Sequence, residues 1–235
     1  MPRLFQIACL LIISLIFYFS VFFSSIFFSS TLAYSQTEAQ ASAVVTFAID
    51  FPTSEPEHYS IRVQSDGAAH YQSSGRFIAD SDETDSFDLD FTLAAETRQK
   101  IFELAAKAGY FKKDVDSHHK GLAFTGKKTL TYKDAQRSGE STYNYSPNTA
   151  VQELTSLMQG LSATLECGHR LQYDRQYQKL ALDEELKHME ELARANELVE
   201  VTAIQPILDQ IIADQSVINV TRARAQRLLQ QAGVH

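Results

Sequence analysis

Hydrophobic and polar residues alternate along the first half of the chain in the way that half-buried β-strands require. The segment SFDLDF sets apolar residues against Asp88 and Asp90, so one face of this strand is expected to be buried and the other solvated. Strand-like composition recurs in AVVTFAIDF, YSIRVQS, AAHYQSS, TLTYKD and STYNYS. The pattern predicts a strand-rich segment from Val44 to about Ser146.

The dipeptide Asp66-Gly67 predicts a β-hairpin between YSIRVQS and AAHYQSS, because it readily adopts the positive φ angles of a two-residue turn. A turn centred on these two residues would place His70 opposite Val63. The register of this hairpin decides which of its side chains face the core.

One segment inside the strand-rich region has a helical period. LAAETRQKIFELAAKAGYF places Ile101, Leu104 and Ala105 on one face, with Thr92 as the expected N-cap and Gly109 as a left-handed C-terminal residue. The order of strands, helix, strands and helix predicts an α+β fold, in which an antiparallel sheet carries helices on one face.

The second half of the chain has helical periodicity and no strand pattern. Ser146 and Pro147 are expected to begin one helix, and a long helix is expected to end near Asn196. Two shorter helices are expected around residues 204–212 and 220–232. The predicted organisation is residues 1–35 as signal peptide or anchor, 36–43 as linker, 44–163 as α+β domain and 164–235 as an all-helical extension.

The N-terminus predicts export. Arg3 precedes the apolar and uncharged run FQIACLLIISLIFYFSVFFSSIFF. Small residues precede two potential cleavage positions, after Ser35, which is favoured, and after Ala43. Residues 5–28 are also long enough to form an uncleaved membrane anchor, since about 20 apolar residues span a bilayer. Either outcome places the remainder of the chain in the periplasm or outside the cell.

Composition and charge limit the classes of partner. The chain has 235 residues, of which 44% are hydrophobic and 21% charged, and a net charge of −8. This is the composition of a globular protein, and its acidity together with export argues against a nucleic-acid partner. Cys167 is the only cysteine after the apolar run, so no internal disulfide is expected. On a predicted helix it does not face His169, so it is interpreted as a small buried residue, with a nucleophile as the alternative.

The stretch GLAFTGKKT partly matches a phosphate-binding loop. Gly121, Gly126 and Lys127 occupy the glycine and lysine positions, but Lys128 stands where a hydroxyl residue should bind magnesium. A polar segment precedes the stretch, and the strand-like TLTYKD follows it, whereas a phosphate loop joins a buried strand to a helix. The stretch is therefore interpreted as a turn that enters a strand, with its lysines facing solvent.

Two other groups of residues invite a metal hypothesis. Asp80, Asp82 and Asp85 could form an irregular calcium site, with a solvated acidic turn as the alternative, but they do not follow the helix-loop-helix calcium pattern. His118 and His119 are adjacent and have no third ligand at a useful spacing. No metal, cofactor or catalytic residue is predicted.

Two sets of side chains are candidates for a partner surface. Tyrosines on predicted strands could line a binding face, although aromatic strand residues usually fill a core. Arginines on the last helix could dock an acidic partner or could be the solvated face of that helix. The two sets are Tyr132, Tyr143 and Tyr145, and Arg222, Arg224 and Arg227.

Part of the chain resembles a known group of proteins. YSIRVQSDGAAHYQSS, SFDLDFTLAAETRQKIFELAAKAGYF and TLTYKD together resemble a family of uncharacterised exported bacterial α+β domains, over about residues 57–163. The tail IIADQSVINVTRARAQRLL looks like a recurring C-terminal companion of such proteins. The resemblance implies an envelope or secreted location and supplies no catalytic residue.

The leading hypothesis is an exported, non-catalytic binding or interaction module of the cell envelope, whose partner is a protein or another envelope component. An exported hydrolase or metal-dependent enzyme, with residues assembled only by the fold, is the alternative. A structural envelope protein held by its N-terminal helix is a third hypothesis. In each case the only membrane contact expected is through residues 5–28 if they are not cleaved.

Overall fold

The computed structural model describes residues 42–52, 54–76 and 84–233. The expected export segment, most of the linker, and Asp80 and Asp82 lie outside the described residues. Contacts divide the chain into two units, and the unit Gln40–His235 contains every described residue. Within the described part, no helix is both long enough and apolar enough to cross a membrane.

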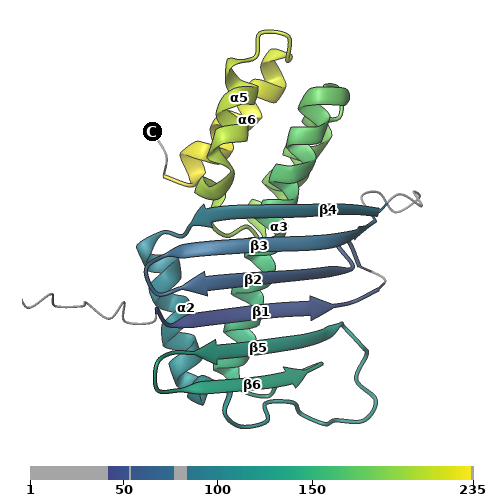
Figure 1. Ribbon diagram of the computed structural model, residues 1–235. Coiled ribbons are helices and arrows are strands. Elements are labelled where there is room, and N and C mark those ends of the chain that lie inside the picture. Colours follow the sequence, from purple (N-terminus) through teal and green to yellow (C-terminus); the bar gives the residue numbers. More distant parts are fainter. Residues whose placement is uncertain (1–41, 53, 77–83, 234–235) are drawn as a thin grey trace, which may run out of the picture. The chain divides into compact units, whose positions relative to one another are not determined.

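Six strands of the described chain form one antiparallel sheet in the order β4-β3-β2-β1-β5-β6 (Figure 1). β1 lies in the middle of the sheet and pairs with both β2 and β5. The alternation in sequence explains the two faces, because Val45, Phe47 and Ile49 of β1 are buried while the residues between them are not. The strands are β1 Val44–Asp50, β2 His58–Gln64, β3 Ala68–Arg76, β4 Thr84–Thr92, β5 Lys127–Lys133 and β6 Ser138–Tyr143.

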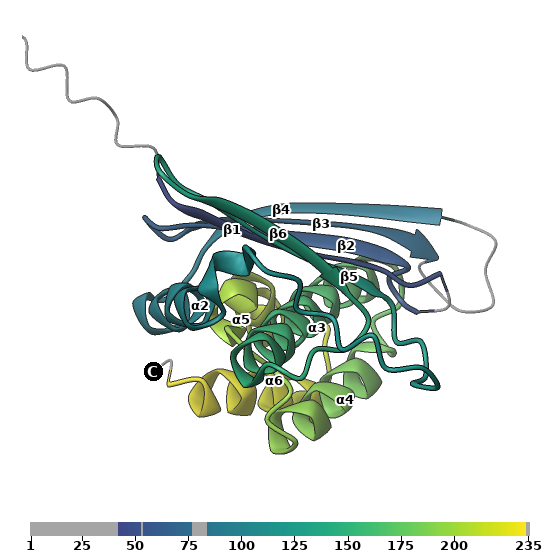
Figure 2. The ribbon, with the colours of Figure 1, turned by 90° about the horizontal axis from the view of Figure 1, so that it is seen from below.

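The helices cover one face of the sheet and leave the other face open (Figure 2). α2 and α3 pack under the strands, and the C-terminal helices pack mainly on α3 and on one another. This arrangement confirms the predicted α+β class with its helical extension. The helices are α2 Ala95–Lys107, η1 Gly109–Phe111, α3 Thr149–Tyr177, α4 Leu182–Arg194, η2 Val201–Ile204, α5 Gln205–Ala213 and α6 Asn219–Gln231.

α3 passes under the sheet from one edge to the other. Near its start, the Thr155 hydroxyl lies 2.5 Å from the hydroxyl of Tyr143 on edge strand β6. Farther along, Ser162 lies 2.8 Å from the Tyr71 hydroxyl on β3. His169 then stacks on Phe87 of the opposite edge strand β4, with ring centroids 4.2 Å apart. The expected domain boundary between residues 163 and 164 falls inside this helix.

The predicted two-residue turn in the β2–β3 hairpin is wrong by one residue. His70 lies opposite Arg62, so the connection has three residues. Gly67 adopts φ +102°, and the backbone N–H of Ala68 donates to the Asp66 carboxylate at 3.0 Å. This side-chain bond fixes a longer turn that ends in a left-handed glycine, a geometry the same dipeptide also allows.

Two predicted N-caps are also wrong. Thr92 ends β4, and the backbone N–H of Ala94 before α2 instead donates to Glu200, 106 residues later in the chain, at 3.3 Å. α3 is capped by Asn148, whose side chain accepts from the N–H of Ala150 at 2.9 Å, and not by Ser146. Tertiary contact supplies the first cap, and Asn148, which lies two residues after Ser146 and is a comparably good capping residue, supplies the second.

The helix ends are partly as predicted. Gly109 follows α2 with φ +68°, which confirms the left-handed residue after this helix. The expected continuous helix up to Asn196 is instead divided, because α3 ends at Tyr177 and α4 begins at Leu182. Pro206 lies in the first turn of α5 as expected.

A row of small residues on α3 allows the chain that leads into α5 to pack closely against this helix. A Cβ atom on Gly160 would lie 2.8 Å from Val199 Cγ2, and one on Gly168 would lie 2.4 Å from Ile204 Cγ2. Between them, the Thr164 hydroxyl donates to the Gly160 carbonyl and accepts the N–H of Val199, both at 3.0 Å. The helical extension therefore depends on the absence of side chains at two positions.

We expect Gly168→Ala to destabilise the protein, although alanine has the higher helix propensity. Alanine in a helix gains about 1 kcal/mol over glycine, but forcing a methyl group into the Ile204 contact costs about 1–3 kcal/mol. Urea unfolding should give a lower midpoint for Gly168→Ala than for the wild type. Gln159→Ala, at an exposed position of the same helix, is the control and should change the midpoint little. A more stable Gly168→Ala variant would contradict the close contact.

Candidate functional site

The three candidate tyrosines do not form one surface. Tyr132 and Tyr143 lie on the helix-covered face of the sheet and are buried, and burial raises the pKa of each to about 12. The Tyr132 hydroxyl donates to Asp134 at 2.9 Å. Tyr145 lies beyond the end of β6, contrary to its predicted place on a strand, and is exposed. Two of the tyrosines are therefore core residues.

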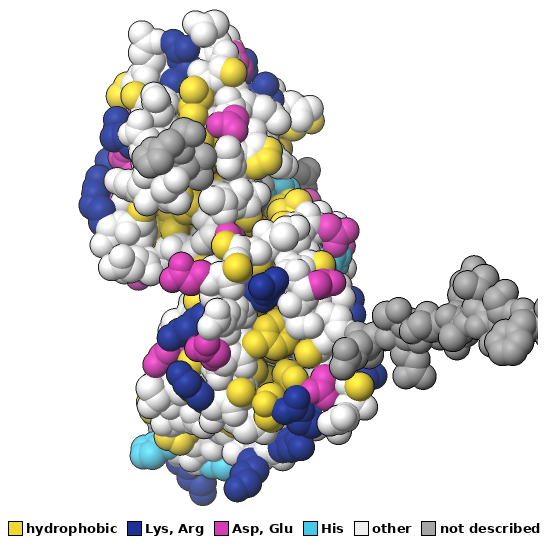
Figure 3. Space-filling model, turned by 90° about the vertical axis from the view of Figure 1, so that its left-hand side faces the viewer, with side chains coloured by type: hydrophobic (Ala, Val, Ile, Leu, Met, Phe, Trp, Pro, Cys, Tyr) yellow, Lys and Arg dark blue, Asp and Glu magenta, His cyan; other side chains and the backbone are white. Residues whose placement is uncertain are grey.

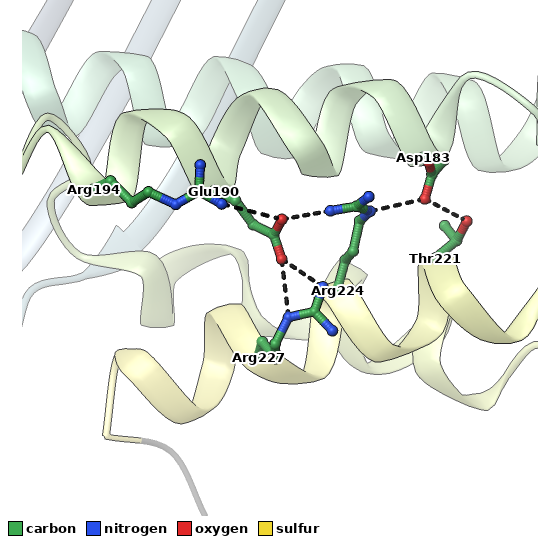
Figure 4. A network of polar contacts seen from close by, with 6 residues as sticks. All are labelled: Asp183, Glu190, Arg194, Thr221, Arg224 and Arg227. Atoms are coloured by element: carbon green, nitrogen blue, oxygen red, sulfur yellow. Dashed lines mark hydrogen bonds and ion pairs between the residues drawn. The ribbon is translucent and has the colours of Figure 1, made fainter.

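Arg224 and Arg227 hold α6 against α4 (Figure 4). Glu190 of α4, only 7% exposed, accepts from Arg224 Nη1 at 2.5 Å and from Arg227 Nη2 at 2.7 Å. Arg224 Nε also donates to Asp183 at 3.0 Å. Burial by itself raises the pKa of Glu190, but the bonds from Arg227 and Arg224 outweigh it and hold this pKa below its usual value.

Arg222, the third candidate arginine, donates to Asn219 one turn earlier on α6. The other two candidate arginines, Arg224 and Arg227, form the ion pairs between α4 and α6. Figure 3 shows the side of the molecule to the left of Figure 1, where basic and acidic side chains are interspersed around a group of apolar ones and no large patch of one charge appears. An arginine docking surface is therefore not supported by these contacts.

The stretch that resembles a phosphate loop is a turn before β5, as predicted. Lys127 is exposed, but Lys128 is only 4% exposed, so the expectation that both lysines face solvent is wrong for Lys128. Its ammonium group donates to the carbonyl oxygens of Thr125 at 2.9 Å and Asn144 at 3.1 Å. Burial lowers the pKa of Lys128. Lys128 stabilises the loop by donating hydrogen bonds to backbone carbonyls. Because its ammonium group is used in this way, the stretch does not have the arrangement of a phosphate-binding loop.

The metal hypotheses gain no support within the described residues, where no group of three or more metal-binding side chains occurs. His118 lies in a loop, with Nε2 2.7 Å from the carboxylate of Asp114, and this hydrogen bond raises the pKa of His118. Asp85 lies on β4 and is 3.4 Å from Nε2 of His169. Of the three candidate calcium ligands, only Asp85 belongs to the described residues.

A polar crevice between β3, β4 and α3 was not predicted. The Tyr71 hydroxyl, buried in the core, donates to Glu166 at 2.6 Å, and His169 faces Asp85 one turn along α3. The crevice has a volume of about 30 Å³, which suffices for one or two water molecules. Cys167, on the same helix, is buried as predicted, and burial raises its pKa to about 12. The crevice is too small to hold a substrate of ordinary size.

The edge of the sheet at β4 has the features of a binding surface. Within the described part of the chain, β4 pairs with β3 on one side and with no strand on the other. Its helix-side residues Phe87, Leu89 and Phe91 pack on the core but are only partly buried. On the open face, the side chains of Asp88 and Asp90 are 62% and 89% exposed. Among the described residues, the edge therefore offers backbone groups that no neighbouring strand pairs, between an apolar row and an acidic row. One N–H of β4, that of Ser86, already donates to the Asp85 carboxylate at 2.8 Å.

His70 of β3 lies beside the acidic row. Its Nδ1 is 2.8 Å from Asp90 and its Nε2 is 3.5 Å from Asp88. A shallow hollow of about 540 Å³ lies on the open face at this place, between His70, Asp90 and Arg62. The alternation in SFDLDF identified the two rows, but only the strand order places them at an edge.

A second hollow of about 540 Å³ lies where α2 begins and α4 and α6 end. It has mixed chemistry, with Glu96, Glu200 and Arg194 beside apolar side chains. One carboxylate oxygen of Glu200 accepts the Thr202 hydroxyl at 2.7 Å as well as the N–H before α2. Glu200 lines the hollow, but its hydrogen bonds give it a structural role.

Comparison with known protein families and with curated proteins finds no match for this chain. The geometry of the described residues is therefore the basis for a functional proposal.

We expect Lys128→Met to lower the free energy of unfolding by about 2 kcal/mol, since buried carbonyl groups lose a charged donor. Lys127→Ala, one residue earlier at an exposed position, should change it by less than about 0.5 kcal/mol. Thermal unfolding of the two variants gives the comparison. An unchanged or higher melting temperature for Lys128→Met would mean that the cost of burying the ammonium group outweighs its hydrogen bonds.

We expect Glu190→Gln to destabilise the protein by about 3 kcal/mol at neutral pH, because it leaves partly buried arginines without their carboxylate. Since the folded pKa of Glu190 is lowered, its contribution is complete above its unfolded pKa near 4.5 and is lost as the pH falls through the folded pKa. The difference from the wild type in urea unfolding should thus shrink below about pH 4.5.

Arg194→Gln is the control for this measurement. Arg194 lies 3.8 Å from Glu190 and its side chain is 70% exposed, so its removal should cost less than about 1 kcal/mol. Equal losses for the two variants would contradict the central place of Glu190 in the contact between α4 and α6.

Proposed function

We propose that this chain is an exported, non-catalytic binding module of the bacterial cell envelope, which takes up an extended segment of a partner protein along the edge of β4. The observation that carries the proposal is the outer edge of a nine-residue strand, which no other described strand pairs, with a half-buried apolar row on one side. An added strand would gain backbone hydrogen bonds from the edge and apolar contacts from Phe87, Leu89 and Phe91.

The opposite edge of the sheet is less suited to such a partner. β6 has six residues, and its Gly139 lies so close to η1 that a Cβ atom there would be 2.1 Å from the Tyr110 carbonyl. Beyond β6, the N–H of Ser117 donates to the Tyr145 carbonyl, and the N–H of Asn144 donates to Asp116. The chain between α2 and β5 therefore already occupies the surroundings of β6, which favours β4 as the receiving edge.

The crevice at His169 supports binding over catalysis. It brings a histidine close to Asp85 and Glu166, but its volume of about 30 Å³ is roughly a tenth of the smallest ordinary ligand pocket. The Tyr71 and Glu166 side chains are already hydrogen-bonded to each other there. These residues are best explained as a polar contact that positions α3 under the edge of the sheet.

Hydrogen–deuterium exchange tests the proposal directly. The exported protein, purified from the envelope of an expressing bacterium, is mixed with a library of nine-residue peptides of varied charge and apolar pattern. Peptides that bind should slow amide exchange in β4, because its unpaired N–H groups become donors to a new strand. The amides of β6 serve as an internal control and should exchange at an unchanged rate. Protection at β6 alone, or at neither edge with every peptide, would refute the proposal.

A further inference from the structure

We propose that the segment bound at β4 alternates apolar residues with lysine or arginine, and that its apolar residues pack on Tyr173 of α3. This inference rests on the proposed binding of an extended segment at β4. It adds the chemistry of the partner and the place of its side chains.

α3 indicates where a seventh strand would lie. Its residue His169 lies directly under β4, in contact with Phe87. Neighbouring strands are about 4.8 Å apart, and four residues of helix advance about 6 Å. Tyr173, four residues after His169 and on the same side of the helix, is therefore placed under the position that the next strand would take.

The aromatic surface continues past the sheet. Figure 1 shows the C-terminal part of α3 extending beyond β4, on the side away from β3. There Tyr173 is partly buried, and its ring lies 5.0 Å from that of Tyr177, which is 65% exposed. With Phe87 and His169, these tyrosines form an aromatic row along α3 that begins under β4 and ends in solvent. Apolar side chains of an added strand would cover its outer part.

The open face determines the charge of the partner. On this side, an added strand would place every second residue next to Asp88 or Asp90, whose side chains are mostly exposed. Opposite charges on neighbouring strands stabilise pairing, and like charges oppose it. Among the described residues, the basic groups near this row are His70, already in contact with both aspartates, and Arg62, two strands from the edge. A partner with basic residues on the open face and apolar residues on the helix side fits both rows.

The same charges disfavour a second copy of this chain as the occupant. Antiparallel pairing of β4 with β4 of another molecule would place Asp88 opposite Asp88 or opposite Asp90 in the registers that align these residues. Like charges directly opposite each other destabilise a sheet and are a common protection of edge strands against self-association. The acidic row therefore disfavours pairing with β4 of a second molecule and favours pairing with a basic strand.

Three nine-residue peptides with blocked ends test the inference: one alternating valine with lysine, one alternating valine with glutamate, and one with the valines and lysines in blocks. Each is titrated into the exported protein by fluorescence anisotropy at low and at moderate salt, with amide exchange of β4 as the second readout. We expect the alternating lysine peptide to bind most tightly, to lose affinity as salt is raised, and to protect β4.

Substitutions identify the contacts. Asp88→Asn combined with Asp90→Asn should weaken the lysine peptide about tenfold, as expected for two exposed charge pairs. Tyr173→Ala should weaken both alternating peptides, since it removes the apolar contact whatever the charge. Glu140→Gln, an exposed position of the other edge strand β6, is the matched control and should leave binding unchanged.

The outcomes separate the inference from the function on which it rests. Equal binding and equal β4 protection by the lysine and glutamate peptides would overturn the basic partner while keeping the edge as a binding site. Equal binding by the alternating and block peptides, without β4 protection, would show unspecific attraction to an acidic protein and overturn the inference. A third outcome is that none of the peptides protects β4, and that the protein self-associates until charge is added at the β4 edge. This outcome would identify a second copy as the occupant and would also overturn the inference.

Discussion

The packing of α3 across the inner face of the sheet is the contact on which the other features depend. Seven apolar residues of this helix are fully buried, and each buried leucine or methionine contributes about 1.5–3 kcal/mol from the hydrophobic effect. A hydrogen bond to Tyr143 at one edge and a ring stack on Phe87 at the other edge then fix its position. The helix thereby joins the sheet on one side to the C-terminal helices on its other side.

The helical extension is held by two different interactions. Glycines at positions 160 and 168 let the chain before α5 approach the backbone of α3, and the Thr164 hydroxyl bonds to that chain. Farther from the sheet, Glu190 joins α4 to α6 through arginines. Two of the three candidate arginines of the last helix, Arg224 and Arg227, are therefore explained as structural, because a buried carboxylate requires paired charges.

The proposed site combines local pattern with tertiary position. The alternation of phenylalanine, leucine and aspartate was readable in SFDLDF, and it predicted one buried and one solvated face. Whether such a strand is central or at an edge depends on which strands pair with it, and these partners are distant in sequence or connected by turns of uncertain length. The aromatic row on α3 also depends on tertiary position. Tyr173 is part of the proposed site only because His169, four residues earlier on the helix, lies under β4.

The sequence by itself determined the α+β class, the approximate extent of the strands, the left-handed Gly109 and the burial of Cys167, because periodicity and local backbone preference report directly on these features. Only the tertiary structure decided the hairpin register, the cap that Glu200 gives to α2, the burial of Lys128 and the exposure of the β4 edge. Each of these depends on groups that the fold brings together from distant positions, or on a choice between turns of nearly equal local energy, which a single sequence does not resolve.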